Sequence, residues 1–151
     1  MQYVFGTGGI HAARSGCYEK SDNLKIKTVD VSSYYPNLSI KNNLYPDHLG
    51  SVFCEIYQDL YEQRKKTKKA SDENLALKLA LNGTYGASND QYSPMYDPKF
   101  TMSITINGQL LLCMLAEKLM TVDGVQILMM NTDGLEYSVS PENENVTVSI
   151  S

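Results

Sequence analysis

The hydrophobic and polar positions change their period along the chain, and each period predicts an element. Side chains alternate from residue 24 to Asp30, with β-branched residues among them, which predicts a strand ending at Asp30. Apolar residues recur at steps of four between residues 50 and 69, as they do in a helix. A second helix is expected at residues 72–85, stopped by Gly86. These two helices would form an antiparallel hairpin.

The later patterns predict a longer helix followed by a β-hairpin. Residues 125–130 have the composition of a buried strand, Asp133-Gly134 is a turn signal, and residues 135–139 return as a second strand. Residues 101–121 are strongly apolar, and we expect this helix to pack under a sheet. Its expected buried stripe consists of Ile104, Leu111, Leu115 and Leu119.

The two ends of the chain carry weaker patterns. Residues 1–23 are rich in glycine and predict irregular structure, and Pro36 is expected to end the strand region around Asp30. Residues 141–151 are polar and then β-like. Strand segments on both sides of a helical hairpin predict an α+β fold, with an antiparallel sheet backed by helices and a two-helix insertion.

Composition and charge place the chain among ordinary globular domains. Its 151 residues are 42% hydrophobic, which suffices for one domain with a real core. The formal net charge of −4 argues against a general nucleic-acid-binding protein, which usually has a basic excess. Positive charge is nevertheless concentrated locally, because five cations lie within six residues. They are Arg64, Lys65, Lys66, Lys68 and Lys69.

Cysteine use and hydropathy predict a soluble protein of the cytoplasm. Cys17, Cys54 and Cys113 are widely spaced, which disfavours a disulfide framework or a zinc site and favours a reducing compartment. The first residues lack the pattern of a signal peptide. The most apolar window, residues 109–120, is too short to span a membrane, so no membrane partner is expected.

Two carboxylates and one helical face could carry chemistry. Asp30 at a strand end and Asp133 at a hairpin tip would meet if their strands were neighbours. Two divalent cations held by such carboxylates can drive phosphoryl transfer, and Mg²⁺ completes its shell with water and substrate phosphates. Lys78, Asn82 and Tyr85 share one face of the second helix, which suits a bound nucleotide.

Each of these features also has an ordinary explanation when it is taken alone. An aspartate at a strand end or before glycine often serves the turn. The face of Lys78 could simply be solvated, and the basic run could be a solvated helix end instead of a phosphate-binding surface. Gly8-Gly9 could admit a nucleic-acid strand close to the backbone or could be only a flexible turn.

Three signatures in a fixed order decide between these explanations. Asp30-Val31-Ser32-Ser33-Tyr34-Tyr35-Pro36 is similar to D-x-x-S-L-Y-P, and Lys78-Leu79-Ala80-Leu81-Asn82-Gly83-Thr84-Tyr85-Gly86 to K-x-x-x-N-S-x-Y-G. Asn131-Thr132-Asp133-Gly134 follows as a variant of D-T-D-S. Together they resemble motifs A, B and C of family B DNA polymerases, and the protein-primed phage branch most closely. Gly8-Gly9 resembles the Y-x-G-G element of that family.

The resemblance implies a role for each matching residue of the first motif. Asp30 would bind both metal ions, assisted by the Val31 carbonyl. Ser33 would lie near the triphosphate of the incoming nucleotide. Tyr35 would act as the steric gate that blocks a ribose 2′-hydroxyl, so the enzyme would prefer deoxynucleotides.

The second and third motifs imply further contacts. Lys78 and Asn82 would bind near the triphosphate, and Tyr85 would lie against the nascent base pair. Asp133 would be the second metal ligand, whereas Asn131 replaces an aspartate of the family and removes one negative charge. Arg64 and, by the same analogy, Lys68 would be cations of the preceding helix. Contacts to DNA would come from Gly8, Gly9, Gly86, Asn131 and Thr132.

The resemblance therefore implies template-directed addition of deoxynucleotides to a primer 3′-hydroxyl. Two Mg²⁺ ions would be the cofactors, with Mn²⁺ as a substitute, and primer–template DNA and dNTPs the partners. Exonuclease and thumb segments would be further partners. Residues 1–49 would form a first palm segment, residues 50–88 the fingers, and residues 89–151 a second palm segment. Two alternatives stay open, a non-catalytic primer–template binding module and a metal-dependent nuclease.

Overall fold

The computed structural model describes residues 1–150, which divide into two compact units. The sheet unit comprises Met1–Val31 and Gly108–Ser151, and the helical unit comprises Ser32–Asn107. The division of the chain into two palm segments separated by fingers, at residues 49–50 and 88–89, stays a prediction.

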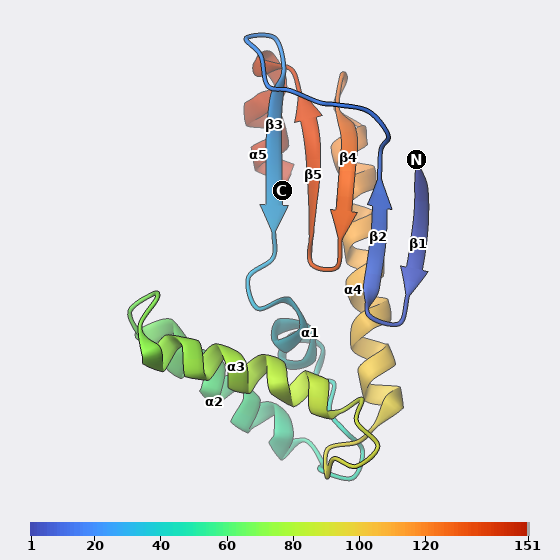
Figure 1. Cartoon of the computed structure of the whole chain (residues 1–151). Helices are drawn as coiled ribbons and strands as arrows, with labels where there is room; N and C mark the ends of the chain where they lie inside the picture. The colour runs from blue at the N-terminus through green and yellow to red at the C-terminus, as the bar shows by residue number, and fades with distance from the viewer. Residues whose placement is uncertain (151) are drawn as a thin grey trace. The chain divides into compact units, whose positions relative to one another are not determined.

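The sheet unit is built on five antiparallel strands in the order β1-β2-β4-β5-β3 (Figure 1). The central strands therefore include two from the carboxyl-terminal third of the sequence. The strands are β1 (Gln2–Gly6), β2 (Gly9–Ala13), β3 (Lys25–Asp30), β4 (Gln126–Asn131) and β5 (Gly134–Val139).

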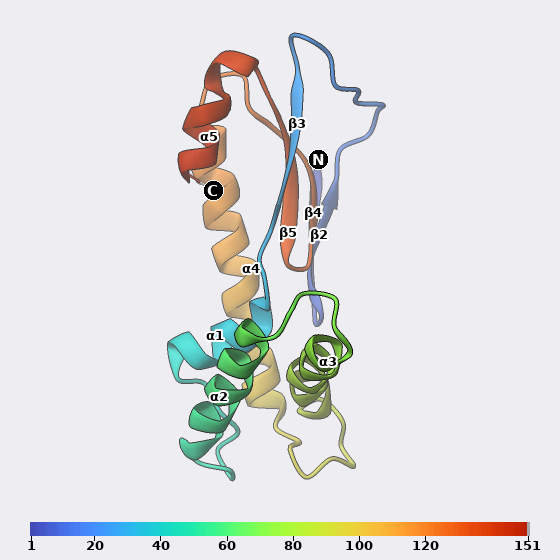
Figure 2. The same ribbon diagram turned by 90° about the vertical axis from the view of Figure 1, so that its left-hand side faces the viewer.

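One face of this sheet is covered and the other is open. Figure 2 shows α5 (Glu144–Ile150) and the second half of α4 (Pro98–Met120) on the same side of the strands. A short 3₁₀ turn, η1 (Pro141–Asn143), leads into α5. On the covered side the strands bury Ile10, Ile127, Met130, Leu135, Tyr137 and Val139.

The helical unit consists of α1 (Tyr34–Asn42), α2 (Val52–Lys66), α3 (Asp72–Ala87) and the first half of α4. The α2–α3 hairpin confirms the predicted pair of helices (Figure 1). The Ser71 side chain caps α3 by accepting a hydrogen bond from the Asn74 amide, which satisfies a free N–H of the first turn. The helix continues one residue past Gly86, so this glycine does not stop it.

The prediction of irregular structure for residues 1–23 is wrong for the β1–β2 hairpin. Gly6 pairs with Gly9 at its turn, and Ile10 and Ala12 are buried with the alternation of a strand. The glycines form a tight turn between two strands, so the sequence signal that marked irregular structure marks a hairpin.

Two further expectations about local structure are also wrong. Residues 144–150 form the helix α5 despite their β-branched side chains, because tertiary burial, complete at Thr147, outweighs propensity. Pro36 lies in the first turn of α1, where the missing N–H has no intrahelical partner to lose.

The long helix α4 confirms the predicted helix at residues 101–121 but buries a different stripe. Ile104 and Leu119 are buried as expected, whereas Leu111 is 45% exposed and Leu112 is buried in its place. By length and composition α4 could cross a membrane, yet a core helix of a soluble protein passes the same test. One such helix is weak support for a membrane location.

Candidate functional site

In the sheet unit, Asp30 and Asp133 lie at the same end of the open face. Asp30 ends β3, where it pairs with Gly134, and Asp133 stands in the turn between β4 and β5. The Val31 amide donates a hydrogen bond of 3.0 Å to the Asp133 carbonyl. A shallow cavity of about 200 Å³, here called the carboxylate pocket, is lined by Thr28, Val29, Asp30, Met129, Asn131, Asp133, Gly134, Leu135 and Glu136.

The close approach of the strands at this pocket requires a glycine. A Cβ atom at Gly134 would lie 2.6 Å from the Val29 carbonyl oxygen and 3.2 Å from the Asp30 carboxylate. Real Cβ atoms do not tolerate the first distance, so a larger residue would force β3 away from β5. The absence of a side chain leaves the Asp30 carboxylate lying over the hairpin.

The two carboxylates influence each other electrostatically. Burial raises the pKa of Asp133 above its ordinary value, and the negative charge of Asp30 raises that pKa further. A like charge close by and partial desolvation both disfavour the ionised form. Such a pair gains from a cation that would neutralise it.

The donor set fits Mg²⁺ better than a softer metal. The pocket offers carboxylate oxygens, and no group of three His, Cys, Asp or Glu residues among those the structure describes forms a ready-made metal site. Mg²⁺ is commonly bound through one or two carboxylates, with water and substrate phosphates as the other ligands. Asp30 and Asp133 would hold it in that way.

Asn131 and Thr132 are locked into the hairpin turn beside the pocket. The Thr132 amide donates to the Ile10 carbonyl at 2.9 Å, and its hydroxyl donates to the Asn131 side-chain oxygen at 3.3 Å. Thr132 has a φ of 48°, which is rare for a residue other than glycine. Strained backbone of this kind persists only where its surroundings over-determine it.

Gly8 lies in the connection between β1 and β2, and Gly9 is the first residue of β2, next to this turn. Gly9 has a φ of 149°, and a Cβ atom there would lie 3.0 Å from the Thr132 Cα. The glycine is therefore explained by close contact with the protein's own backbone. At Gly8 an added Cβ would meet nothing within 4 Å. A DNA contact by either glycine stays a prediction.

In the helical unit, Ser33, Arg64 and Lys78 line one cavity. The Arg64 guanidinium donates a hydrogen bond of 2.6 Å to the Ser33 hydroxyl, and Ser33 has a left-handed φ of 50°. The cavity, here called the basic cavity, has a volume of about 480 Å³. It is lined by Ser32, Ser33, Tyr61, Arg64, Lys65, Thr67, Lys69, Ala70, Asn74, Leu75 and Lys78.

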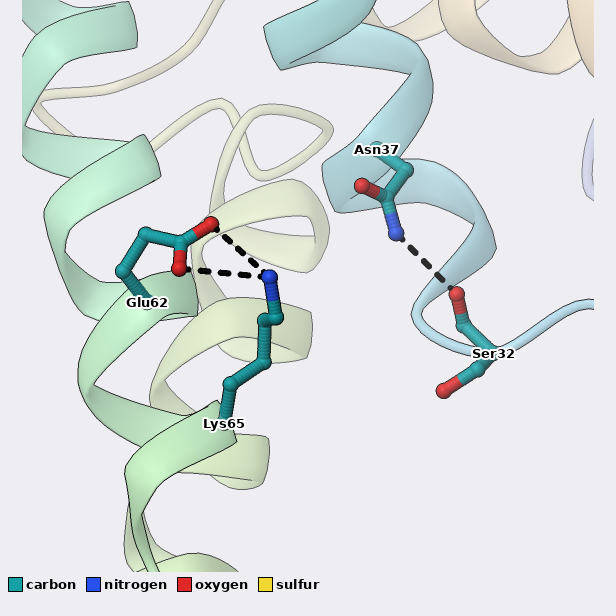
Figure 3. Close-up of polar contacts among 4 residues, drawn as sticks. All are labelled: Ser32, Asn37, Glu62 and Lys65. Carbon is teal, nitrogen blue, oxygen red and sulfur yellow. Dashed lines mark hydrogen bonds and ion pairs between the residues drawn. The ribbon is translucent and has the colours of Figure 1, made fainter.

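The cations of the basic cavity are held in different ways. Lys65 contacts both carboxylate oxygens of Glu62 at 3.2 Å, as Figure 3 shows. The same view shows Asn37 donating to the Ser32 carbonyl, a bond of 3.1 Å that holds the start of α1 (Figure 3). Lys65 is thus partly neutralised, which leaves Arg64, Lys69 and Lys78 as the other cations that line the cavity.

The aromatic residues of the first two motifs lie together. The ring centroids of Tyr35 and Tyr85 are 4.5 Å apart, and the Tyr85 hydroxyl forms a hydrogen bond of 2.8 Å with the Thr105 hydroxyl. This bond fixes Tyr85, and Tyr85 in turn supports Tyr35. Asn82 and Gly86 are exposed on the same helix, and neither lines the basic cavity.

Two polar residues of the open face, His11 and Glu136, were not predicted from the sequence. Glu136 lines the carboxylate pocket and accepts a hydrogen bond of 3.3 Å from the Thr28 hydroxyl. His11 lies directly opposite Asn131 in the register of β2 and β4. Glu136 stands two residues after Gly134, so the alternation of a strand would have placed it on the same sheet face as the third motif. His11 could be placed on that face only from the register of β2 and β4.

No protein-family model matches the chain, nor does any curated protein. A solved structure that matches is the family B DNA polymerase of the hyperthermophilic archaeon Pyrobaculum calidifontis, with a TM-score of 0.55 and 19% sequence identity. The match covers 91% of this chain and 25% of that polymerase. This similarity does not support the protein-primed phage branch. The chain has a family B polymerase-like fold.

Proposed function

We propose that the chain is the palm and fingers core of a template-directed DNA polymerase. The observation that carries the proposal is the convergence of Asp30 and Asp133, 103 positions apart in sequence, on one pocket of a polymerase-like sheet. Residues 1–49 and 89–151 would supply the palm, and residues 50–88 the fingers.

The carboxylate pocket would bind the metal ions that act on the reacting groups. Asp30 and Asp133, with the Val31 carbonyl, would hold Mg²⁺ or Mn²⁺, which supplies charge neutralisation for attack by a primer 3′-hydroxyl and for departure of pyrophosphate. Asn131 would contribute an amide beside these ligands in place of a third charge.

The helical unit would bind the incoming deoxynucleotide. Arg64 and Lys78 would bind its triphosphate, with Ser33 as a polar neighbour. Tyr35 would exclude a ribose 2′-hydroxyl, and its ring contact with Tyr85 supports a rigid gate. Tyr85 would then face the nascent base pair.

A non-catalytic primer–template binding module is the second candidate, and Asn131 favours it. An amide at this position removes a negative charge from the metal ligands, which weakens the attraction for divalent cations. Such a module would bind the same DNA without extending it.

Primer extension with Mg²⁺ and dNTPs separates these functions. We expect the chain to extend a primer and Asp133→Ala to abolish extension. Asp123→Ala is the matched control, because Asp123 also precedes a glycine in the sheet unit but does not line the pocket. Binding without extension by the unmodified chain would leave only the binding module, and degradation of the primer would indicate a nuclease.

A further inference from the structure

His11 belongs to a row of residues that crosses the whole open face of the sheet. In this row Val4 pairs with His11, His11 with Asn131, Asn131 with Gly134, and Gly134 with Asp30. Side chains directly opposite each other on paired strands point to the same face. The imidazole therefore lies on the face of the carboxylate pocket, as the immediate neighbour of Asn131.

The position of His11 is fixed by contacts on both sides of it. Before it, the Ile10 carbonyl accepts from the Thr132 amide; after it, the Arg14 amide donates to the Leu128 carbonyl at 2.8 Å. A slip of one residue would turn the fully buried Ile10 to the open face and His11 to the core. The register is therefore specified, and with it the pairing of His11 with Asn131.

The open face is chemically asymmetric along this row. Asp30, Asp133 and Glu136 gather around the pocket at one end. Beyond Gly134, Asn131 and His11 carry no negative charge, and both can donate hydrogen bonds. A bound anion is repelled by the first group of side chains and can be hydrogen-bonded by the second.

The side chain at position 131 affects which groups the His11 imidazole can bind. An aspartate there would face the imidazole across the strand pair and form an ion pair or a charge-assisted hydrogen bond with it. Asn131 offers no such charge, and its side-chain oxygen already accepts from the Thr132 hydroxyl. His11 is exposed, so a ring N–H can meet a ligand on this face.

We propose that His11, together with Asn131, binds the phosphodiester next to the primer 3′ end. This inference rests on the proposed function and adds a residue to its primer site. The ligand chemistry is that of a backbone phosphate, since the contact needs an anionic oxygen and no particular base. His11 positions the primer and is not involved in bond making.

Equilibrium binding of primer–template DNA without divalent metal tests this contact. Two primers are compared, one natural and one with an uncharged methylphosphonate at the linkage next to the 3′ end. We expect His11→Ala to weaken binding of the natural primer about tenfold or more, as for a hydrogen bond to a charged group. With the methylphosphonate primer the same variant should bind as the unmodified chain does.

Two further variants separate the contact from a structural effect. His11→Asn keeps an N–H donor and should recover some of the affinity for the natural primer. Gln126→Ala removes an exposed polar side chain at the other end of β4 and should leave both affinities unchanged. Melting temperatures of all variants should agree within error, because the substituted side chains are exposed.

Equal affinities of His11→Ala and the unmodified chain for the natural primer would overturn the contact while the proposed function stands. An equal loss on both primers would also overturn it, because the effect would not pass through that phosphate. Failure of the unmodified chain to bind primer–template at all would refute the proposed function itself, and this inference with it.

Discussion

At the residue scale, the carboxyl group of Asp133 is the most informative side chain of the sheet unit. Its pKa is raised by burial and by the charge of Asp30. The folded protein therefore holds this proton up to a higher pH than the unfolded chain does. Stability conferred by the protonated form is lost as the pH rises through the folded-state pKa.

The raised pKa of Asp133 predicts how Asp133→Asn changes the pH dependence of stability. Below the ordinary pKa of 3.8 the variant and the unmodified chain should be about equally stable, and above the raised pKa the variant should be the more stable of the two. Melting temperatures measured from pH 3 to pH 7 without divalent metal check this, with Asp123→Asn as the control. A variant less stable than the unmodified chain at pH 7 would contradict the assigned repulsion.

Single residues were predictable from the sequence where a motif named them. Asp30, Asp133, Arg64, Ser33 and Lys78 were all singled out, and the structure places two of them at one pocket and three at another. The sequence could not indicate that His11 shares a sheet face with the third motif, because that register depends on long-range pairing. Glu136 lies two residues after Gly134 in the same strand, so alternation alone could have placed it on that face.

At the element scale, Gly134 and Gly83 make a matched pair for one substitution. Gly134→Ala should destabilise the protein by about 1–3 kcal/mol, because its Cβ would approach the Val29 carbonyl to 2.6 Å. Gly83→Ala should stabilise it by about 0.5–1 kcal/mol, because Gly83 lies in α3 with nothing within 4 Å of an added Cβ. Urea unfolding of the two variants measures both effects.

Gly134→Ala tests the close approach of β3 and β5, and Gly83→Ala tests the need for a glycine in α3. Each result can therefore be interpreted alone. An unchanged free energy of unfolding for Gly134→Ala would mean that β3 and β5 separate at little cost. The close contact at the carboxylate pocket would then not stabilise the protein. A destabilising Gly83→Ala would indicate that the exposed face of α3 needs this glycine.

Elements were predictable where a pattern was long and lacked competing signals. The helices α2, α3 and α4 and the β4–β5 hairpin follow from periodicity. The β1–β2 hairpin was missed because glycines interrupt two short strands. The helix α5 was missed because its side chains favour strands, whereas burial within the sheet unit, complete at Thr147, decides its conformation.

At the scale of the whole molecule, the two compact units should differ in their response to a local lesion. The Tyr57 hydroxyl, buried in the helical unit, donates a hydrogen bond of 2.6 Å to the Leu81 carbonyl. Burial also raises the pKa of this tyrosine. Tyr57→Phe should cost about 1–2 kcal/mol, because the bond that joins α2 to α3 is lost.

Hydrogen–deuterium exchange can locate that loss. Exchange should rise across residues 32–107, and peptides from the five strands should change much less. Leu60→Ile, a change of shape without loss of a polar group, serves as the comparison. A uniform rise along the whole chain would show that the two units unfold as one.

The fold class was predictable because the order of the patterns, strands before and after a helical hairpin, restricts the architecture. The order of the strands within the sheet was not, since it depends on which hairpins meet after the helices have formed. That order also bears on synthesis. The strands β2 and β3 are made early, but both pair with strands from the end of the chain. Residues 32–107 are contiguous and can fold during translation, whereas β2 and β3 must wait for β4 and β5. On the ribosome, the carboxylate pocket therefore forms only after the helical unit has been synthesised.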